Sequence, residues 1–123
     1  IWSGPTITFE KANGVDPELP ENQDRITDNV WITRNNGGQI FNIVEETEAD
    51  KDLSPKGTLW AQGTTAELDD LDFTPFREAI RPQDSPGVDL VMVLVEDQIA
   101  IDVKFLSWSG NQMGGFSYQR ATE

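Results

Sequence analysis

Trp108 and the glycine-rich loop that follows it carry the residue types best suited to ligand chemistry. The stretch FLSWSGNQMGGFSYQR, residues 105–120, places the amides of Asn111 and Gln112 close behind the indole ring. An aromatic ring can stack on the apolar C–H face of a sugar while neighbouring amides hydrogen-bond its hydroxyl groups. We therefore predict that Trp108, Asn111 and Gln112 bind a glycan.

The same loop also has a purely structural interpretation. Its glycines, Gly110, Gly114 and Gly115, lack the spacing of a dinucleotide-binding loop and the lysine of a P-loop. The loop also follows a strand without opening a helix, which argues against phosphate binding. Because glycine supplies the positive φ angles of tight turns, the loop can equally be a simple connection between the last two strands.

Alternation along residues 98–108 adds two polar candidates to the site. The odd-numbered residues from 99 to 105 are Ile, Ile, Val and Phe, so this side of the strand is predicted to face the core. Asp102, Lys104 and Trp108 share the opposite side. We therefore expect Asp102 and Lys104 to supply further hydrogen bonds beside an exposed Trp108.

Two more tryptophans lie out of phase with the aliphatic side of their strands. Trp31 shares its side with Asn29 and Thr33, and Trp60 shares its side with Thr58 and Gln62. One interpretation is an exposed aromatic platform that adds Trp31 and Trp60 to the ligand-binding set. The other is a second covered surface, packed under a loop or helix.

The acidic residues suggest a cation site in the segment DPELPENQDRITDN, with Asp24 and Asp28 as its ligands. Carboxylate and carbonyl oxygens are ligands that calcium prefers, although no EF-hand pattern is present. Calcium is the one cofactor that these residues would hold. In the alternative interpretation, Asp24 and Asp28 cap turns and pair with Arg25 or Arg34.

The composition narrows the classes of function. The chain has no cysteine and no histidine, which excludes thiolate nucleophiles, Cys/His zinc sites and histidine-dependent triads. A net charge of −13 disfavours nucleic acid and anionic membrane surfaces as partners. No apolar run is long enough to insert into a membrane. Among 22 acidic residues a pair at hydrolytic spacing arises by chance, so we do not predict an enzyme.

The hydrophobic pattern predicts short strands at residues 6–11, 29–34, 39–44, 58–63 and 115–120, with one or two helical turns between 64 and 80. Residues 89–95 and 98–108 form the clearest hairpin. Its register pairs Met92 with Ile101 and Asp89 with Lys104. We predict a single domain, residues 1–123, with an all-β fold: an antiparallel, jelly-roll-like β-sandwich.

Three stretches also support a family resemblance: GPTITFEKANGVDPELPENQDRITDNVWITR from Gly4, GTLWAQGTT from Gly57, and IDVKFLSWSGNQMGGFSYQR from Ile101. Together they resemble a recurrent domain of secreted or surface proteins of environmental and marine bacteria. The resemblance covers nearly the whole chain and implies export from the cell and a β-rich fold. It includes no catalytic motif and assigns no active site.

These observations lead to a functional prediction with two alternatives. We predict a non-catalytic extracellular module that binds a polysaccharide or a surface protein. The first alternative is a structural or adhesin domain of a bacterial surface layer or fibre, in which the edge strands Thr6–Lys11 or Gly115–Arg120 pair with a neighbouring sheet. The second is a small glycan-active enzyme.

Overall fold

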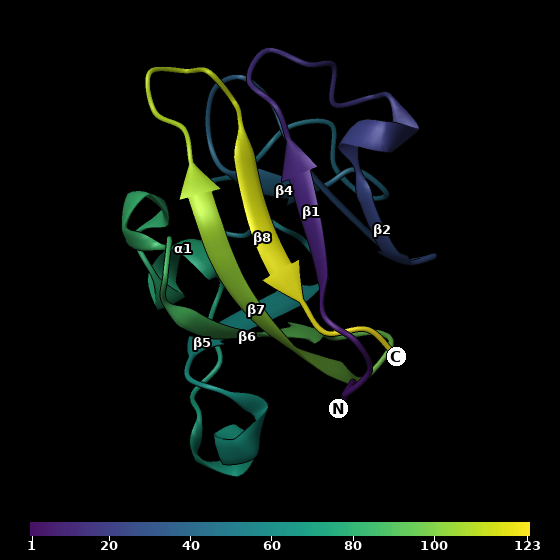
Figure 1. Ribbon diagram of the computed structural model, residues 1–123, viewed down its shortest axis with the longest axis vertical. Coiled ribbons are helices and arrows are strands. Elements are labelled where there is room, and N and C mark those ends of the chain that lie inside the picture. The colour runs from purple at the N-terminus through teal and green to yellow at the C-terminus, as the bar shows by residue number, and fades with distance from the viewer.

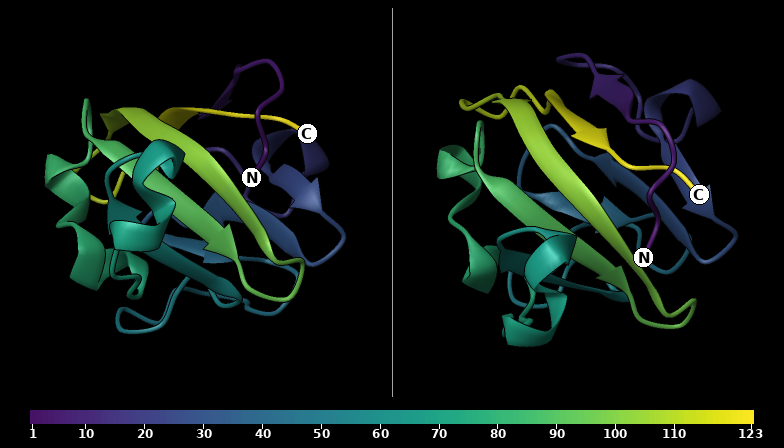
Figure 2. Two further views of the ribbon diagram at one scale, coloured as in Figure 1. Left: turned by 90° about the horizontal axis from the view of Figure 1, so that it is seen from below. Right: turned by 60° about the horizontal axis from the view of Figure 1, so that its bottom comes forward.

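The computed structural model describes residues 1–123 and consists of two antiparallel sheets packed face to face (Figures 1 and 2). The larger sheet has the strand order β1-β8-β7-β6-β5. Its strands are β1 (Ile7–Lys11), β5 (Thr58–Gln62), β6 (Asp89–Leu94), β7 (Ile99–Trp108) and β8 (Phe116–Arg120). The predicted all-β sandwich is confirmed, whereas the jelly-roll likeness stays a prediction.

The smaller sheet has the order β2-β3-β4 and covers one face of the larger sheet. Its strands are β2 (Asp24–Thr27), β3 (Val30–Arg34) and β4 (Ile40–Asn42). Short helices decorate the loops: η1 (Pro20–Asn22), η2 (Thr65–Asp70), α1 (Phe76–Ala79) and η3 (Pro82–Asp84). No helix in the structure combines the length and the apolar character that a membrane span requires.

The predicted register of the β6–β7 hairpin is confirmed for the six strand pairs from Asp89–Lys104 to Leu94–Ile99, and residues 95–98 form the turn. Leu94 faces Ile99, Met92 faces Ile101, and Leu90 faces Val103. On the other side of the sheet, the Lys104 ammonium lies 3.2 Å from the Asp89 carboxylate. One register therefore satisfies both faces of the hairpin, which is why the sequence specified it so strongly.

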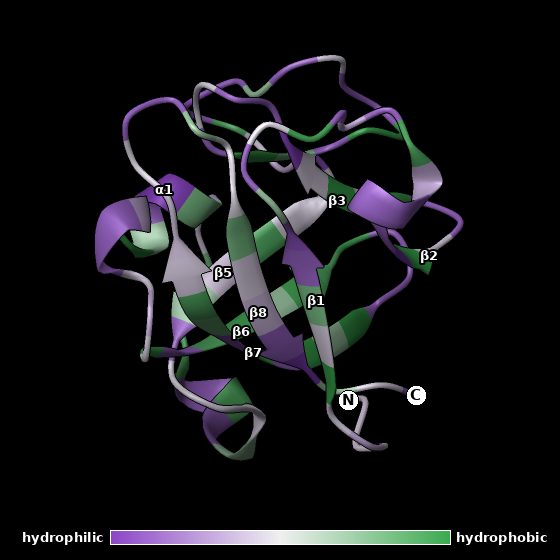
Figure 3. Cartoon of the chain, turned by 45° about the horizontal axis from the view of Figure 1, so that its top comes forward, coloured by the Kyte–Doolittle hydropathy of each residue, from purple (hydrophilic) through white to green (hydrophobic).

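The core between the sheets takes side chains from both sheets. Figure 3 shows in green the hydrophobic residues along β6 and β7, the two strands of the hairpin. Sixteen buried apolar residues form one cluster. Its largest members are Trp60, Phe76, Phe105, Phe116 and Tyr118, and their rings pack at tilted or edge-on angles.

Two features differ from the sequence-based expectation. β2 (Asp24–Thr27) was not among the predicted strands, and it pairs with β3 across an irregular register. β8 is an interior strand between β1 and β7, so of the two expected edges only β1 lies at the edge of a sheet.

Candidate ligand-binding cleft

The β7–β8 connection is a tightly held loop. Gly110 and Met113 close a turn whose central residues, Asn111 and Gln112, have φ angles of 54° and 58°. Two successive positive φ angles are the signature of a type I′ turn, which matches the twist of the strands it joins. Both amide side chains are exposed at the tip of the loop.

Two buried cations fix the base of this loop. Lys11 donates from Nζ to the Gly114 carbonyl at 3.0 Å, and Arg34 donates from Nη1 to the Gly115 carbonyl at 2.8 Å. Gly114 has a φ of 78°, and a Cβ there would come within 2.8 Å of the Asn35 carbonyl oxygen. The glycine is therefore needed so that the loop can pass close to the β3–β4 turn.

Trp108 faces the core, which corrects the prediction that it lies on the polar side of β7. The pairing of β7 with β8 shifts between Phe105 and Ser107, so Leu106 and Ser107 both lie opposite Ser117. This β-bulge reverses the alternation, and both Leu106 and Ser107 are exposed. Trp108 then packs against Phe105 and Phe116 and stays half-buried.

Arg34 lies over the indole of Trp108. Its Cζ atom is 3.9 Å from the ring centre, within the range of a cation–π contact. Arg34 also donates from Nε to the Gly38 carbonyl at 2.8 Å. Because the guanidinium and the aromatic cluster surround the ring, Trp108 presents no open face for a sugar to stack on.

A cleft of about 280 Å³ opens beside this pair. The β7–β8 loop, the β3–β4 turn, the loop after β4, α1 and η3 border it. Trp108, Asn111 and Gln112 all line the cleft, so the structure brings these three predicted residues together. Arg34, Lys51 and Arg77 also line it, and none of the lining residues is a carboxylate.

Burial perturbs both cations beneath the loop. Desolvation lowers the pKa of Arg34 from its usual value to about 10. Desolvation, with a smaller contribution from the charge of Arg34, also lowers the pKa of Lys11. Neither side chain has a carboxylate within salt-bridge distance, since the two ion pairs of the structure are Lys104–Asp89 and Arg120–Asp24. The interior below the cleft therefore carries uncompensated positive charge.

Asp102 and Lys104 lie away from this cleft. Asp102 accepts hydrogen bonds from the Thr65 backbone N–H at 2.8 Å and from the Thr65 hydroxyl at 2.7 Å. These bonds hold η2 against the outer face of the large sheet. Asp102 and Lys104 instead line a separate and larger depression of about 420 Å³ beside the N-terminal segment, so they do not complete the site around Trp108.

Trp60 and Trp31 are also separate from the cleft. The Trp60 side chain is fully buried between the sheets and donates from Nε1 to the Thr58 hydroxyl at 2.8 Å. It cannot serve as an exposed platform, because β5 is covered on both faces and the out-of-phase side is the core side. Trp31 is half-buried on the outer face of the small sheet, where the Arg25 guanidinium lies 3.9 Å from its ring centre.

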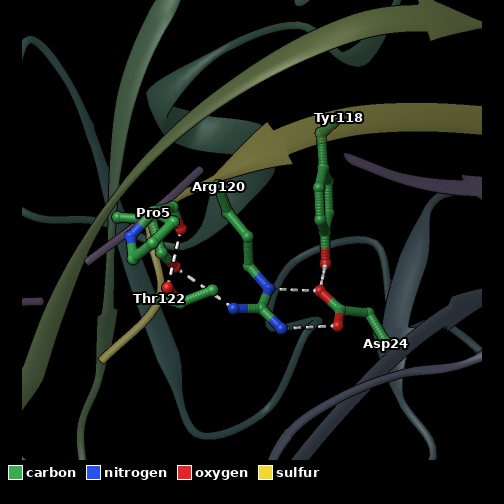
Figure 4. A network of polar contacts seen from close by, with 6 residues as sticks. Pro5, Asp24, Tyr118, Arg120 and Thr122 are labelled. Carbon is green, nitrogen blue, oxygen red and sulfur yellow. Dashed lines mark hydrogen bonds and ion pairs between the residues drawn. The ribbon is translucent and has the colours of Figure 1, made fainter. Parts of the chain in front are cut away.

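Asp24 joins the two sheets. It is buried and accepts hydrogen bonds from Arg120 Nε at 2.6 Å, Arg120 Nη2 at 2.8 Å and the Tyr118 hydroxyl at 2.5 Å (Figure 4). Both carboxylate oxygens are therefore engaged, and Asp24 is not free to bind calcium as predicted. Its partner is Arg120 rather than Arg25 or Arg34. Asp28 is exposed, and the structure contains no cluster of three or more acidic residues arranged to hold a metal ion.

The three basic residues of the cleft, Arg34, Lys51 and Arg77, were absent from the predicted set. Arg34 had a usable signal, because it shares the phase of Val30 and Ile32 along β3 and so had to point inward. Lys51 comes from the loop after β4 and Arg77 from α1, and only the tertiary fold brings them to one opening.

Comparisons of this chain with protein-family models, with curated proteins and with solved structures found no match.

Proposed function

We propose that this domain is a non-catalytic extracellular module that binds a glycan in the cleft beside Trp108. The observation that carries the proposal is the convergence of Trp108, Asn111 and Gln112 on one opening. Its volume of about 280 Å³ lies just below the range of ligand pockets, which is roughly 300–1,000 Å³. The cleft therefore suits one sugar unit rather than a long chain segment.

The roles within the site differ from those expected of an aromatic platform. Trp108 orders Arg34 and supplies one wall of the cleft, because its ring is held between the guanidinium and the core. Asn111 and Gln112 project from the turn and are the groups that would hydrogen-bond sugar hydroxyls.

The test compares matched loop variants for retention on immobilised polysaccharides. Asn111 and Gln112 have positive φ angles, so glycine removes each side chain without straining the backbone. We expect Asn111→Gly/Gln112→Gly to weaken retention roughly fivefold, the effect of losing about one net hydrogen bond. Gln98→Gly is the control, because Gln98 has a φ of 55° in an exposed turn away from the cleft. Equal retention of both variants, or no retention of the wild type, would contradict the proposal.

Assembly through an edge strand is the second candidate. β1 is an open edge of the large sheet, and Ile7 on this strand is exposed. An unpaired edge can accept a strand from a neighbouring molecule. Sedimentation over a range of protein concentrations separates the two proposals: association that rises with concentration favours assembly, and a persistent monomer favours the binding module.

A further inference from the structure

The cleft is cationic in a strongly acidic protein. The chain has 22 acidic and nine basic residues, yet three basic residues and no acidic residue line the opening. Lys51 and Arg77 are exposed at its rim, and neither lies within salt-bridge distance of a carboxylate. Asp52 and Glu78 lie beside them on the adjoining surface, outside the cleft. The cleft thus has a local charge opposite to that of the molecule.

The two most deeply buried arginines differ in whether a carboxylate neutralises them. Arg120 is 6% exposed and Arg34 is 4% exposed. Arg120 is neutralised by two hydrogen bonds to the Asp24 carboxylate. Arg34 has no carboxylate partner, and its Nε and Nη1 atoms donate only to backbone carbonyls. Burying a guanidinium without a counter-anion costs free energy, and a bound anion would offset that cost.

One atom of Arg34 remains available to a ligand. Nη2 makes no hydrogen bond within the protein. The one buried side-chain atom without a partner is Gln39 Oε1, so Nη2 retains contact with solvent. Arg34 is one of the residues that line the cleft, so an anion in the cleft is the ligand that this unused donor could bind. The guanidinium is also held rigid by Trp108 and the two carbonyls, which reduces the entropy lost on binding.

We infer that the cleft binds an oxyanion of an acidic glycan, either the carboxylate of a uronic acid or a sulfate ester. Arg34 Nη2 is the innermost donor, Lys51 and Arg77 bind the anion from the rim, and Asn111 and Gln112 contact the hydroxyl groups of the same sugar. This inference rests on the proposed function and specifies the ligand class. Because the rest of the protein is acidic, the ligand is a short or terminal acidic unit rather than a dense polyanion.

The ligands for the test are matched pairs measured by titration calorimetry. Short oligomers of galacturonate, glucuronate and mannuronate are each compared with their carboxyl-reduced neutral counterparts. A sulfated galactose oligosaccharide forms the third arm and distinguishes a sulfate ester from a carboxylate. We expect at least one acidic oligomer to bind roughly tenfold or more tightly than its neutral counterpart, as the loss of a charge-assisted hydrogen bond implies.

The variants test the placement of the site. Lys51→Gln/Arg77→Gln removes the two rim cations, and Lys56→Gln/Arg81→Gln removes two exposed cations outside the cleft with the same change in net charge. We expect the first variant to lose roughly tenfold in affinity for the acidic oligomer and the second to lose less than about twofold. Arg34→Lys keeps the positive charge but lacks Nη2, and it should also weaken binding of the acidic oligomer.

Each outcome has a distinct meaning. If the wild type binds neither acidic nor neutral oligomers, the proposed function and this inference both fail. If acidic and neutral oligomers bind equally, the glycan-binding proposal stands and the oxyanion inference is overturned. If an acidic oligomer is preferred but the rim variant binds it as tightly as the control variant, the cleft is not the site and the inference is also overturned.

Discussion

Asp24 is the residue whose loss should damage the fold most directly. It is the only carboxylate paired with the buried Arg120, and it also accepts the Tyr118 hydroxyl. Removing one partner of a buried ion pair leaves an uncompensated charge, at a cost of about 3–5 kcal/mol. We expect Asp24→Ala to lower the free energy of unfolding by about this amount in a urea titration.

Asp28→Ala is the matched control, because Asp28 is exposed and lies in the turn that follows β2. It should change the free energy of unfolding by less than about 0.5 kcal/mol. Similar losses for the two variants would show that the Asp24–Arg120 pair contributes little beyond ordinary surface polarity.

Tyr118 predicts how stability depends on alkaline pH. Burial, reinforced by the charge of Asp24, raises the pKa of the Tyr118 hydroxyl well above its usual value of 10.0. At a pH between the unfolded and the folded pKa, the folded state keeps the hydroxyl proton and the unfolded state releases it. The contribution of Tyr118 to the free energy of unfolding is therefore fully present only below the unfolded pKa. It is lost as the pH rises above that value toward the folded pKa.

We therefore expect the free energy of unfolding to fall more steeply between about pH 9.5 and pH 11 in the wild type than in Tyr118→Phe. The comparison matters because the lowered pKa values of Lys11 and Arg34 act in the opposite direction and are shared by both proteins. Parallel pH profiles would mean that the Tyr118 hydroxyl ionises as readily in the folded state as in the unfolded state.

At the level of secondary structure, the β7 bulge shows where sequence reasoning succeeds and fails. The β6–β7 register was predictable because residues 89–94 and 99–104 have complementary patterns on both faces. The orientation of Trp108 was not predictable, because the extra residue Leu106 reverses the alternation and the sequence LSW contains no signal for a bulge. The prediction that Trp60 is exposed was wrong for another reason. Both faces of β5 are at least partly covered, so the aliphatic side that carries Leu59 and Ala61 did not identify the core side.

The candidate site follows the same division. Its loop was visible in the sequence, because glycines and amides between two aromatic stretches indicate an exposed turn. The positive charge of the site was not visible, because Lys51 and Arg77 meet Arg34 only after β3, α1 and the loop after β4 have packed together. Long-range contacts of this kind leave no local pattern in a single sequence.

Deletion of Leu106 tests the account of the bulge. Without this exposed residue, Phe105 faces the core, Ser107 faces outward and Trp108 faces the core by simple alternation. We expect the variant lacking Leu106 to fold, with a loss of less than about 2 kcal/mol and with Trp108 still in the aromatic cluster. Near-ultraviolet circular dichroism reports that packing, and chemical unfolding reports the stability.

Deletion of Lys104 is the control, since Lys104 is equally exposed but lies in the regular part of β7. Its removal shifts Phe105 and Trp108 by one position relative to the rest of the strand and should prevent native packing. A Leu106 deletion as damaging as the Lys104 deletion would show that the bulge itself, rather than the alternation it restores, is required for the fold.

At the scale of the whole molecule, added salt should raise the stability of the fold and weaken the binding of an acidic ligand. A net charge of −13 on 123 residues opposes the compact state through self-repulsion, and salt screens that repulsion. Between about 10 mM and about 150 mM sodium chloride, where the Debye length falls from about 30 Å to about 8 Å, we expect the melting temperature to rise by a few degrees.

Binding of the proposed acidic oligosaccharide should respond in the reverse sense, because salt weakens an attraction between the cationic cleft and an anionic ligand. Thermal melting and titration calorimetry in the same buffers measure both trends. Lys56→Gln/Arg81→Gln makes the protein more acidic without touching the cleft, so its melting temperature should rise more steeply with salt while its binding keeps the wild-type salt dependence. If salt strengthened both the fold and the binding, the ligand contact would be apolar, and the positive charge around Arg34 would serve only to hold the loop.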